Sequence, residues 1–196
     1  MPRPKVDAEQ IRETLLTAAE RRLKRMGSAR FSVTDLAADC RMSQSNVYRF
    51  FPNKASLMAA LAERWFREIE AELTARTDTA ARWQDKLTAF VHVQRELKSA
   101  RYDQDPELFW AYLRLAEEHP EPVMAHVDRL QQILASILEP EFRGPDLAAG
   151  CTLVADATQL FRDPFLIARF RDRCTAERAD AVLMAVLQEL ERRRMA

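Results

Sequence analysis

Glycine is the residue whose scarcity constrains this chain most. Only three of the 196 residues are glycine, at positions 27, 144 and 150. Turns in sheet-rich proteins depend on glycine, whereas alanine, leucine, arginine and glutamate, which are abundant here, favour helices. The sequence also shows no alternation of apolar and polar residues typical of a strand, and no residue pair typical of a hairpin turn. We therefore predict an all-α fold with about nine helices separated by proline or polar breaks.

The composition is that of a folded protein, with 47% hydrophobic and 31% charged residues. No apolar run is long enough to cross a bilayer and the N-terminus lacks the apolar stretch of a signal peptide, so we expect a cytoplasmic protein without membrane contact. The three cysteines are far apart and match no metal-binding spacing. Because no phosphate loop and no catalytic set of serine, histidine and aspartate is evident, we expect no metal, no cofactor and no enzymatic activity.

The formal net charge of the chain is zero, but its charges are unevenly distributed. Residues 1–60 contain eleven Lys or Arg and six Asp or Glu residues, which gives this part a net charge of +5 and leaves −5 for residues 61–196. A basic N-terminal third joined to an acidic remainder is expected when one module contacts phosphate groups and the other does not.

Three helices are predicted in the basic N-terminal part. The first extends over about residues 7–26 with an apolar period of 3.6, and Gly27 can end it in a left-handed conformation. Ser32 and Ser43 each precede a short amphipathic segment, and each can cap a short helix. Lys54 opens a longer helix that reaches about residue 75.

The two short helices and the turn between them form a predicted helix-turn-helix over about residues 32–51. Such a unit, preceded by a helix that packs on it, places its second short helix in the major groove of DNA. Gln44 and Asn46 can make bidentate contacts to adenine, and Arg49 can bind guanine or a phosphate. We expect DNA contacts from the following residues: Arg3, Lys5, Ser32, Thr34, Arg41, Ser43, Gln44, Ser45, Asn46, Tyr48, Arg49, Asn53 and Lys54.

These residues carry a family resemblance. The spacing Y-x-x-F-x-x-K at Tyr48, Phe51 and Lys54, together with the F-S-V-T-D-L-A-A segment that begins at Phe31, resembles the DNA-binding domain of the TetR/AcrR family over about residues 8–60. The resemblance implies a DNA-binding domain (1–54) followed by a ligand-binding and dimerisation domain (55–196). It implies a homodimeric repressor that a small-molecule inducer releases from a palindromic, double-stranded DNA operator. A constitutive repressor and a helical interaction module that binds no DNA are the alternatives.

Two positions depart from the family pattern. The family often has glycine in the turn, where this chain has Arg41, and a second glycine in the recognition helix, where this chain has Ser45. An arginine at positive φ costs on the order of 1 kcal/mol. Either the turn adopts another geometry, or Arg41 accepts the strain in exchange for a phosphate contact.

The C-terminal part contains two segments suited to dimerisation. Residues 145–162 are almost uniformly apolar or small and are predicted to form one helix buried on most sides, while residues 175–194 carry a broad apolar stripe. The resemblance implies that the last two long helices pair with those of a second copy. We expect a homodimer through about residues 145–162 and 175–194, with the filled core of a monomer as the alternative.

A pocket for the unidentified effector is expected among the helices predicted at residues 55–75, 80–100, 104–118, 121–138 and 145–162. Aromatic side chains are concentrated there, and most of them are expected to be core residues. Asp156 and Gln159 stand out because a polar group buried without a partner in an apolar helix is costly. The candidate ligand-binding residues are Trp65, Trp83, Phe90, Trp110, Arg114, Asp156 and Gln159.

Overall fold

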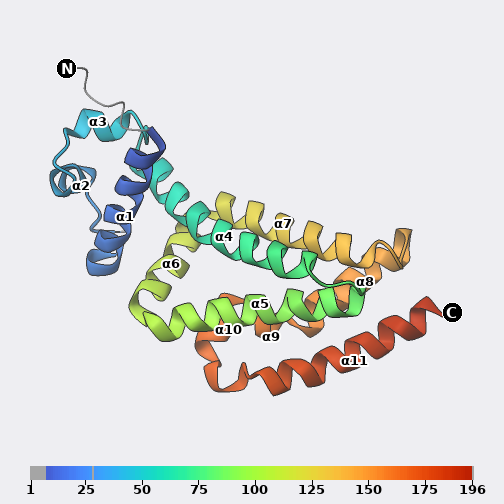
Figure 1. Ribbon diagram of the computed structural model, residues 1–196. Helices are drawn as coiled ribbons and strands as arrows, with labels where there is room; N and C mark the ends of the chain where they lie inside the picture. Colours follow the sequence, from blue (N-terminus) through green and yellow to red (C-terminus); the bar gives the residue numbers. More distant parts are fainter. Residues whose placement is uncertain (1–7, 28, 196) are drawn as a thin grey trace. The chain divides into compact units, whose positions relative to one another are not determined.

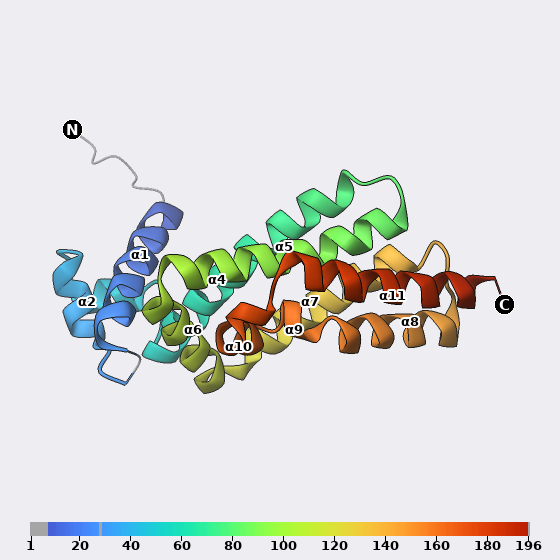
Figure 2. The same cartoon turned by 90° about the horizontal axis from the view of Figure 1, so that it is seen from below.

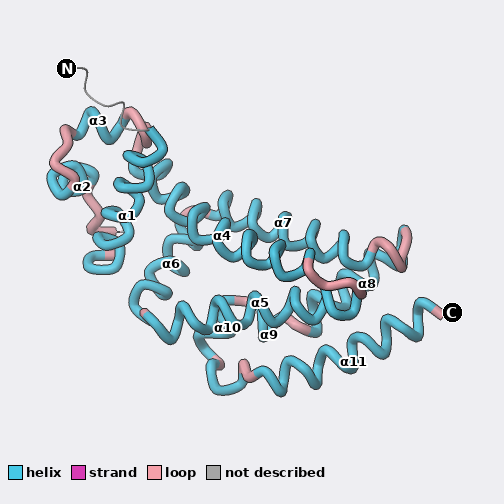
Figure 3. The backbone as a smooth tube through the Cα atoms, in the orientation of Figure 1, coloured by secondary structure: helices cyan, strands magenta, loops and turns pink. Residues whose placement is uncertain are grey.

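The computed structural model describes residues 8–27 and 29–195, and within them it contains helices and no strand (Figure 3), which confirms the all-α prediction. Arg3 and Lys5 lie outside the described residues. The helices, labelled in Figure 1, are α1 (Ala8–Met26), α2 (Val33–Asp39), α3 (Gln44–Tyr48), α4 (Lys54–Asp78), α5 (Trp83–Gln104), α6 (Pro106–Glu118), α7 (Pro120–Leu138), α8 (Gly144–Ala157), α9 (Gln159–Arg162), α10 (Pro164–Arg169), the 3-10 turn η1 (Arg171–Arg173) and α11 (Ala176–Arg194).

The chain divides into two compact units, each built from segments that are separate in sequence. Unit 1 comprises Met1–Trp65 and Glu107–Val123, and unit 2 comprises Phe66–Pro106 and Met124–Ala196. Helix α4 contributes its first half to unit 1 and its second half to unit 2. The expected boundary between a DNA-binding domain (1–54) and a ligand-binding domain (55–196) stays a prediction.

Unit 1 is held together by the apolar face of α1. Leu15, Leu16 and Leu23 are fully buried, and Gly27 follows the helix with φ of 70°, which confirms the predicted left-handed end. Helix α6 adds two aromatic contacts to this unit, because Trp65 stacks on Tyr112 with ring centroids 5.2 Å apart and Phe109 meets the Trp65 ring edge-on at 5.7 Å.

The core of unit 2 is built around α5. Its apolar stripe of Trp83, Leu87, Phe90 and Val91 is buried against side chains from α7, α8 and α11. Helices α8 and α11 lie side by side (Figure 2). Gly150 is the point of close approach, because a Cβ atom there would lie 3.4 Å from a Leu190 methyl group and 3.5 Å from a Leu138 methyl group.

The segment 145–162 differs from the predicted single helix. Helix α8 ends at Ala157, and α9 begins at Gln159, so Thr158 separates them. The Thr158 hydroxyl donates to the Val154 carbonyl (2.6 Å), and the Arg162 guanidinium donates to both the Thr158 hydroxyl and the Ala155 carbonyl (2.8 Å each). These bonds satisfy backbone and side-chain groups at the break. The prediction that the segment is buried on most sides is also wrong for the single chain, since Gly150 and Val154 are the buried residues of α8.

The proline-containing segment 119–122, for which the sequence indicates a turn between the helices predicted at 104–118 and 121–138, is mostly helical in the structure. Helix α7 begins at Pro120, directly after His119, and Pro122 lies in its first turn. Proline is compatible with these positions because the first amide groups of a helix have no intrahelical acceptor. The interruption between α6 and α7 is therefore one residue long.

Candidate nucleic-acid interface

The helix-turn-helix is built from α2, a turn and α3, and both predicted N-caps are confirmed. The Ser32 hydroxyl accepts a hydrogen bond from the Asp35 amide at 3.4 Å, and the Ser43 hydroxyl accepts one from the Asn46 amide at 3.2 Å. Each bond satisfies one of the free amide groups at a helix start. A five-residue helix such as α3 has little stability of its own, so its cap and its packing define its position.

Helix α3 has one buried side and one exposed side. Val47 is fully buried and fixes the helix in unit 1, whereas Gln44, Ser45, Tyr48 and Arg49 are exposed. On the exposed side the Gln44 amide donates to the Tyr48 hydroxyl at 3.3 Å. The polar groups suited to reading base edges therefore project from the face opposite the core.

The turn between the two helices keeps Arg41 in the left-handed region, with φ of 53°. The Arg41 amide donates to the Ala38 carbonyl (3.0 Å) and the Met42 amide to the Ala37 carbonyl (2.8 Å). This is the Schellman arrangement, in which a left-handed residue after the helix allows its last carbonyls to be satisfied. Of the two expected outcomes, the turn thus keeps a left-handed residue at position 41 and the arginine bears the strain, while its side chain is exposed.

Replacing Arg41 with glycine should stabilise the folded chain by about 1 kcal/mol, because glycine adopts positive φ without steric cost. Thermal unfolding followed by circular dichroism measures the change. If Arg41 also contacts a phosphate, the same variant should bind DNA more weakly, with a shallower dependence of affinity on salt. A less stable Arg41→Gly chain would show that the arginine side chain contributes more to the fold than its backbone strain costs.

The remaining candidate DNA contacts have additional roles in the fold. The Asn53 side-chain oxygen accepts from the Ser56 amide at 2.7 Å, so Asn53 is the cap of α4. Lys54 lies in the first turn of α4 with its ammonium group 6.0 Å from the centre of the Phe31 ring. Thr34 is exposed in the first turn of α2. Contacts of all these residues with DNA stay predictions.

Arg22 is a residue of this site that the sequence analysis did not select. Its guanidinium donates to the Asp39 carboxylate (2.6 Å) and to the Asp35 carbonyl (3.1 Å), and thereby joins α1 to α2. The hydrogen bond from Arg22 lowers the pKa of the Asp39 carboxyl group. The signal in the sequence was the position of an arginine on the apolar stripe of α1, between Ala18 and Met26.

The seven candidate ligand-binding residues are divided between the two units. Trp65, Trp110 and Arg114 belong to unit 1, and Trp83, Phe90, Asp156 and Gln159 belong to unit 2. Within unit 2, Phe90 is fully buried, whereas Asp156 and Gln159 are exposed. Unit 2 therefore does not bring its four candidates into one interior site.

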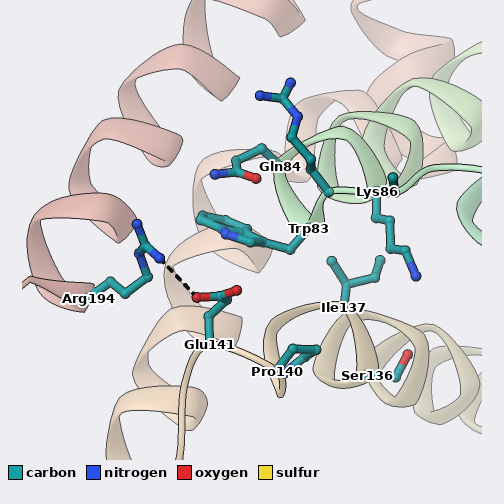
Figure 4. A pocket seen from close by; sticks show the side chains of 10 residues that line it. Trp83, Gln84, Lys86, Ser136, Ile137, Pro140, Glu141 and Arg194 are labelled. Atoms are coloured by element: carbon teal, nitrogen blue, oxygen red, sulfur yellow. Dashed lines mark hydrogen bonds and ion pairs between the residues drawn. The ribbon is translucent and has the colours of Figure 1, made fainter.

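Trp83 borders a surface pocket of about 350 Å³ between the start of α5 and the end of α7 (Figure 4). Arg194 closes one side of it through an ion pair with Glu141 at 3.1 Å. Arg82, at the same pocket, is paired with Asp85 at 2.8 Å. Three of the charged groups at this pocket, Arg82, Glu141 and Arg194, thus already form ion pairs.

A second group of polar side chains that the sequence analysis did not select lies inside unit 2. Gln94 and Lys98 on α5 are 0% and 3% exposed, and they continue the stripe of Leu87 and Val91 at helical spacing. His126 on α7 is 5% exposed. The signal in the sequence was a lysine and a glutamine in register with an apolar stripe, whereas Asp156 was selected for lying in an apolar segment.

The chain was compared with models of protein families, with curated proteins and with solved structures. The model of the tetR family of bacterial regulatory proteins matches residues 15–61, and the tetracyclin repressor-like C-terminal domain matches residues 84–183, which is half of the chain. Comparison with curated proteins found no match. None of the helices in the described residues combines the length and the apolar character needed to span a membrane.

Several solved structures share the fold, among them the following three. A TetR-family transcriptional regulator from Pectobacterium atrosepticum is 25% identical, with 96% of this chain and 94% of that chain covered and a TM-score of 0.58. The regulator FadR from Bacillus subtilis, in complex with stearoyl-CoA, is 14% identical (89% and 96% covered, TM-score 0.66). The superantigen PfiT is 20% identical (93% and 97% covered, TM-score 0.65). The helix-turn-helix, the two family models and this likeness together show that the chain belongs to the TetR family of transcriptional regulators.

Proposed function

We propose that this TetR-family chain is a homodimeric, sequence-specific repressor that acts in the cytoplasm and leaves a palindromic operator when a small-molecule effector binds. The observation that carries the proposal is α3, in which Val47 is fully buried and the side chains of Gln44, Ser45 and Tyr48 are exposed. A helix anchored on one side and polar on the other is what the major groove accommodates.

The groups around α3 have distinct proposed roles. Gln44 and Asn46 read base edges, because their amide groups match the donor and acceptor pattern of adenine. Arg41 and Arg49, on either side of α3, bind phosphates. Lys54 lies at the start of α4, where its charge adds to that of the first helical amide groups.

Dimerisation is proposed through α8 and α11, within the segments 145–162 and 175–194. A shallow apolar groove of about 390 Å³ lies between these helices, lined by Leu153, Ala157, Val182 and Ala185 among others. Met184 beside it is 61% exposed. Burial of such a surface in a second copy would stabilise a two-fold dimer and place two copies of α3 on successive turns of the DNA major groove.

Release by an effector is proposed to operate through α4. This helix contributes Leu57 and Trp65 to the packing of unit 1, and Phe66 to a stack with His126 in unit 2, where the ring centroids are 4.3 Å apart. An effector that changes the position of α4 in the proposed ligand-binding domain (55–196) would also change the DNA-binding domain (1–54). To release most of the repressor, the effector must favour the released form by several kcal/mol.

A DNA-binding titration with a double variant tests the proposal. Fluorescence anisotropy with DNA from upstream of the chain's own gene should show tight, salt-dependent binding by the wild type. The Tyr48→Phe, Lys54→Ala variant should bind about 10- to 100-fold more weakly, because it lacks two phosphate contacts. The Lys86→Ala variant, altered on α5 in unit 2, is the matched control and should bind like the wild type.

The two alternatives predict different results in the same titration. A constitutive repressor binds this DNA but responds to no small molecule among the metabolites of the pathway that it controls. A helical interaction module binds the DNA equally with and without the double substitution and shows no dependence on salt. The likeness to a superantigen shows that this fold does not by itself require DNA binding, so the titration decides the function.

A further inference from the structure

Lys98 is the most unusual charged residue of unit 2. Its side chain is 3% exposed, and its ammonium group donates to the backbone carbonyl of Arg162 at 2.5 Å and to the Gln94 side-chain oxygen at 3.4 Å. Among the described residues no carboxylate lies within ion-pair distance of it. An ammonium group has three protons to donate, so one remains for a further acceptor.

A second cation without a carboxylate partner lies next to Lys98. The Arg162 guanidinium donates to the Thr158 hydroxyl and the Ala155 carbonyl, both neutral acceptors, and lies 5.5 Å from the centre of the Phe90 ring. Burial lowers the pKa of Arg162, yet a guanidinium keeps its charge in proteins. The interior of unit 2 thus contains positive charge from α5 and α9, helices that pack against each other.

Three buried side-chain atoms have no hydrogen-bond partner among the described residues: Nε of Arg95, the hydroxyl of Ser99, which follows Lys98 in α5, and Nε2 of His126. Nδ1 of His126 lies 2.7 Å from the Glu70 carboxylate, which Arg129 also contacts at 2.8 Å. Burial lowers the pKa of His126 most, and the charge of Lys98 lowers it further, so the two groups are within electrostatic reach of each other. Unsatisfied atoms of this kind are rare in protein interiors and are expected where a ligand supplies the missing partner.

We propose that Lys98 and Arg162 bind the carboxylate of an organic acid with an apolar body, and that this acid is the effector. Lys98 is buried and Arg162 is partly buried, and neither forms an ion pair among the described residues, although the Asp163 carboxylate favours the charged form of both. Partial or full burial of two cations is costly, and an anion bound between them would offset that cost. Phe90 and the neighbouring apolar stripe of α5 suit the apolar part of such a molecule. The inference rests on the proposed regulation by an effector, but its binding test requires no DNA.

Isothermal titration calorimetry of the purified chain with octanoate and octanamide tests the proposal. The two probes differ in charge and hardly in size, so octanoate should bind and octanamide should bind at least about 10-fold more weakly, as expected for a charge-assisted contact. Octanoyl-CoA, which carries its charges away from the acyl group, distinguishes a free acid from a thioester effector. Equal binding of octanoate and octanamide, or binding of neither, would overturn the proposal, as would binding of octanoyl-CoA alone.

The Lys98→Met variant separates a binding role from a structural one. It removes the buried charge at nearly constant volume, so the free variant should unfold at a temperature a few degrees higher than the wild type while losing octanoate binding. Lys86→Met on the same helix is the matched control and should change neither property. A Lys98→Met chain that is less stable, or that still binds octanoate as the wild type does, contradicts the assignment.

Proton uptake gives a measurement on the unaltered protein. Burial and the charge of Arg162 lower the pKa of Lys98 to about 7, with a further lowering by Arg101 and a raising by Asp163. Glu70, His126 and Arg129 are the other charged or titratable groups of the cluster. Because a bound carboxylate favours the ammonium form, octanoate binding at pH 8 should take up close to one proton, and its affinity should fall about eightfold from pH 7.5 to 8.5. Binding without proton uptake contradicts the role of Lys98.

The effect of octanoate on operator binding distinguishes this inference from the proposed function. If octanoate binds and weakens operator binding in the anisotropy titration, both hold. If octanoate binds as described but the chain does not bind DNA, the anion site stands and the repressor proposal fails. If the chain binds its operator but no octanoate, the repressor proposal stands and the anion site fails.

Discussion

Replacing Ala185 with glutamate should convert the proposed dimer into monomers and lower operator affinity by about 100-fold or more. Ala185 is exposed in the single chain and lines the groove between α8 and α11, next to Glu189. In a two-fold interface the same patch meets itself, so the new carboxylate would be desolvated close to its own symmetry mate. A monomer binds one half-site instead of two and loses the gain from bivalent contact.

Size-exclusion chromatography with light scattering measures the first effect, and anisotropy with the operator measures the second. The Ala125→Glu variant is the matched control, since Ala125 is exposed on α7 and does not line the groove. It should remain a dimer and bind DNA like the wild type. An Ala185→Glu chain that is dimeric with unchanged affinity would place the dimer interface elsewhere on the protein.

Replacing Val47 with aspartate should destabilise the folded chain by about 3–5 kcal/mol and abolish sequence-specific DNA binding. Val47 is fully buried and is the buried residue of α3. A carboxylate at this fully buried position would lose its hydration, so α3 must leave its position or the carboxylate must bind a proton. Either response changes the surface that would face the major groove.

Urea unfolding and operator titration measure these effects. The same substitution at Val127, which is 43% exposed on α7, is the control and should change stability by less than about 0.5 kcal/mol. A Val47→Asp chain with wild-type affinity would show that α3 is not the DNA-reading helix. If the Val47→Asp chain unfolds completely, its loss of operator binding does not report on α3. The Val47→Ala variant, which removes only methyl groups, covers this case and should show an intermediate loss of affinity.

The helix-turn-helix could be predicted in detail because its determinants are local. Gly27 after α1 and the serines at positions 32 and 43 act through bonds to residues no more than four positions away. The burial of Val47 followed from its position opposite the polar residues of α3. Arg41 was the difficult position, since a strained arginine and an altered turn were equally compatible with the residue type, and only the backbone angle distinguishes them.

The break at Thr158 could not be predicted, because no proline or glycine marks it. It depends on the Arg162 side chain, which returns to bond the Thr158 hydroxyl and the Ala155 carbonyl across the break. The start of α7 at Pro120 was misjudged for the opposite reason, since two prolines in the first turn of a helix resemble a turn in sequence.

The interior of unit 2 was the least predictable part of the candidate site. Asp156 and Gln159 lie in an apolar segment, yet both are exposed, because the single chain buries only one side of α8. Lys98 was overlooked because a lysine usually extends to solvent, and only its register with Leu87 and Val91 indicated an inward position. Periodicity therefore identifies a buried polar residue better than the apolar character of its neighbours does.

Selection from random double-stranded DNA with the purified protein shows whether the chain reads DNA as a dimer through α3. The wild type should enrich a palindrome with two half-sites about one helical turn apart, and the Gln44→Ala, Asn46→Ala variant should lose the motif. Enrichment of no motif by the wild type, or the same motif with the variant, would contradict the proposed reading of DNA by α3.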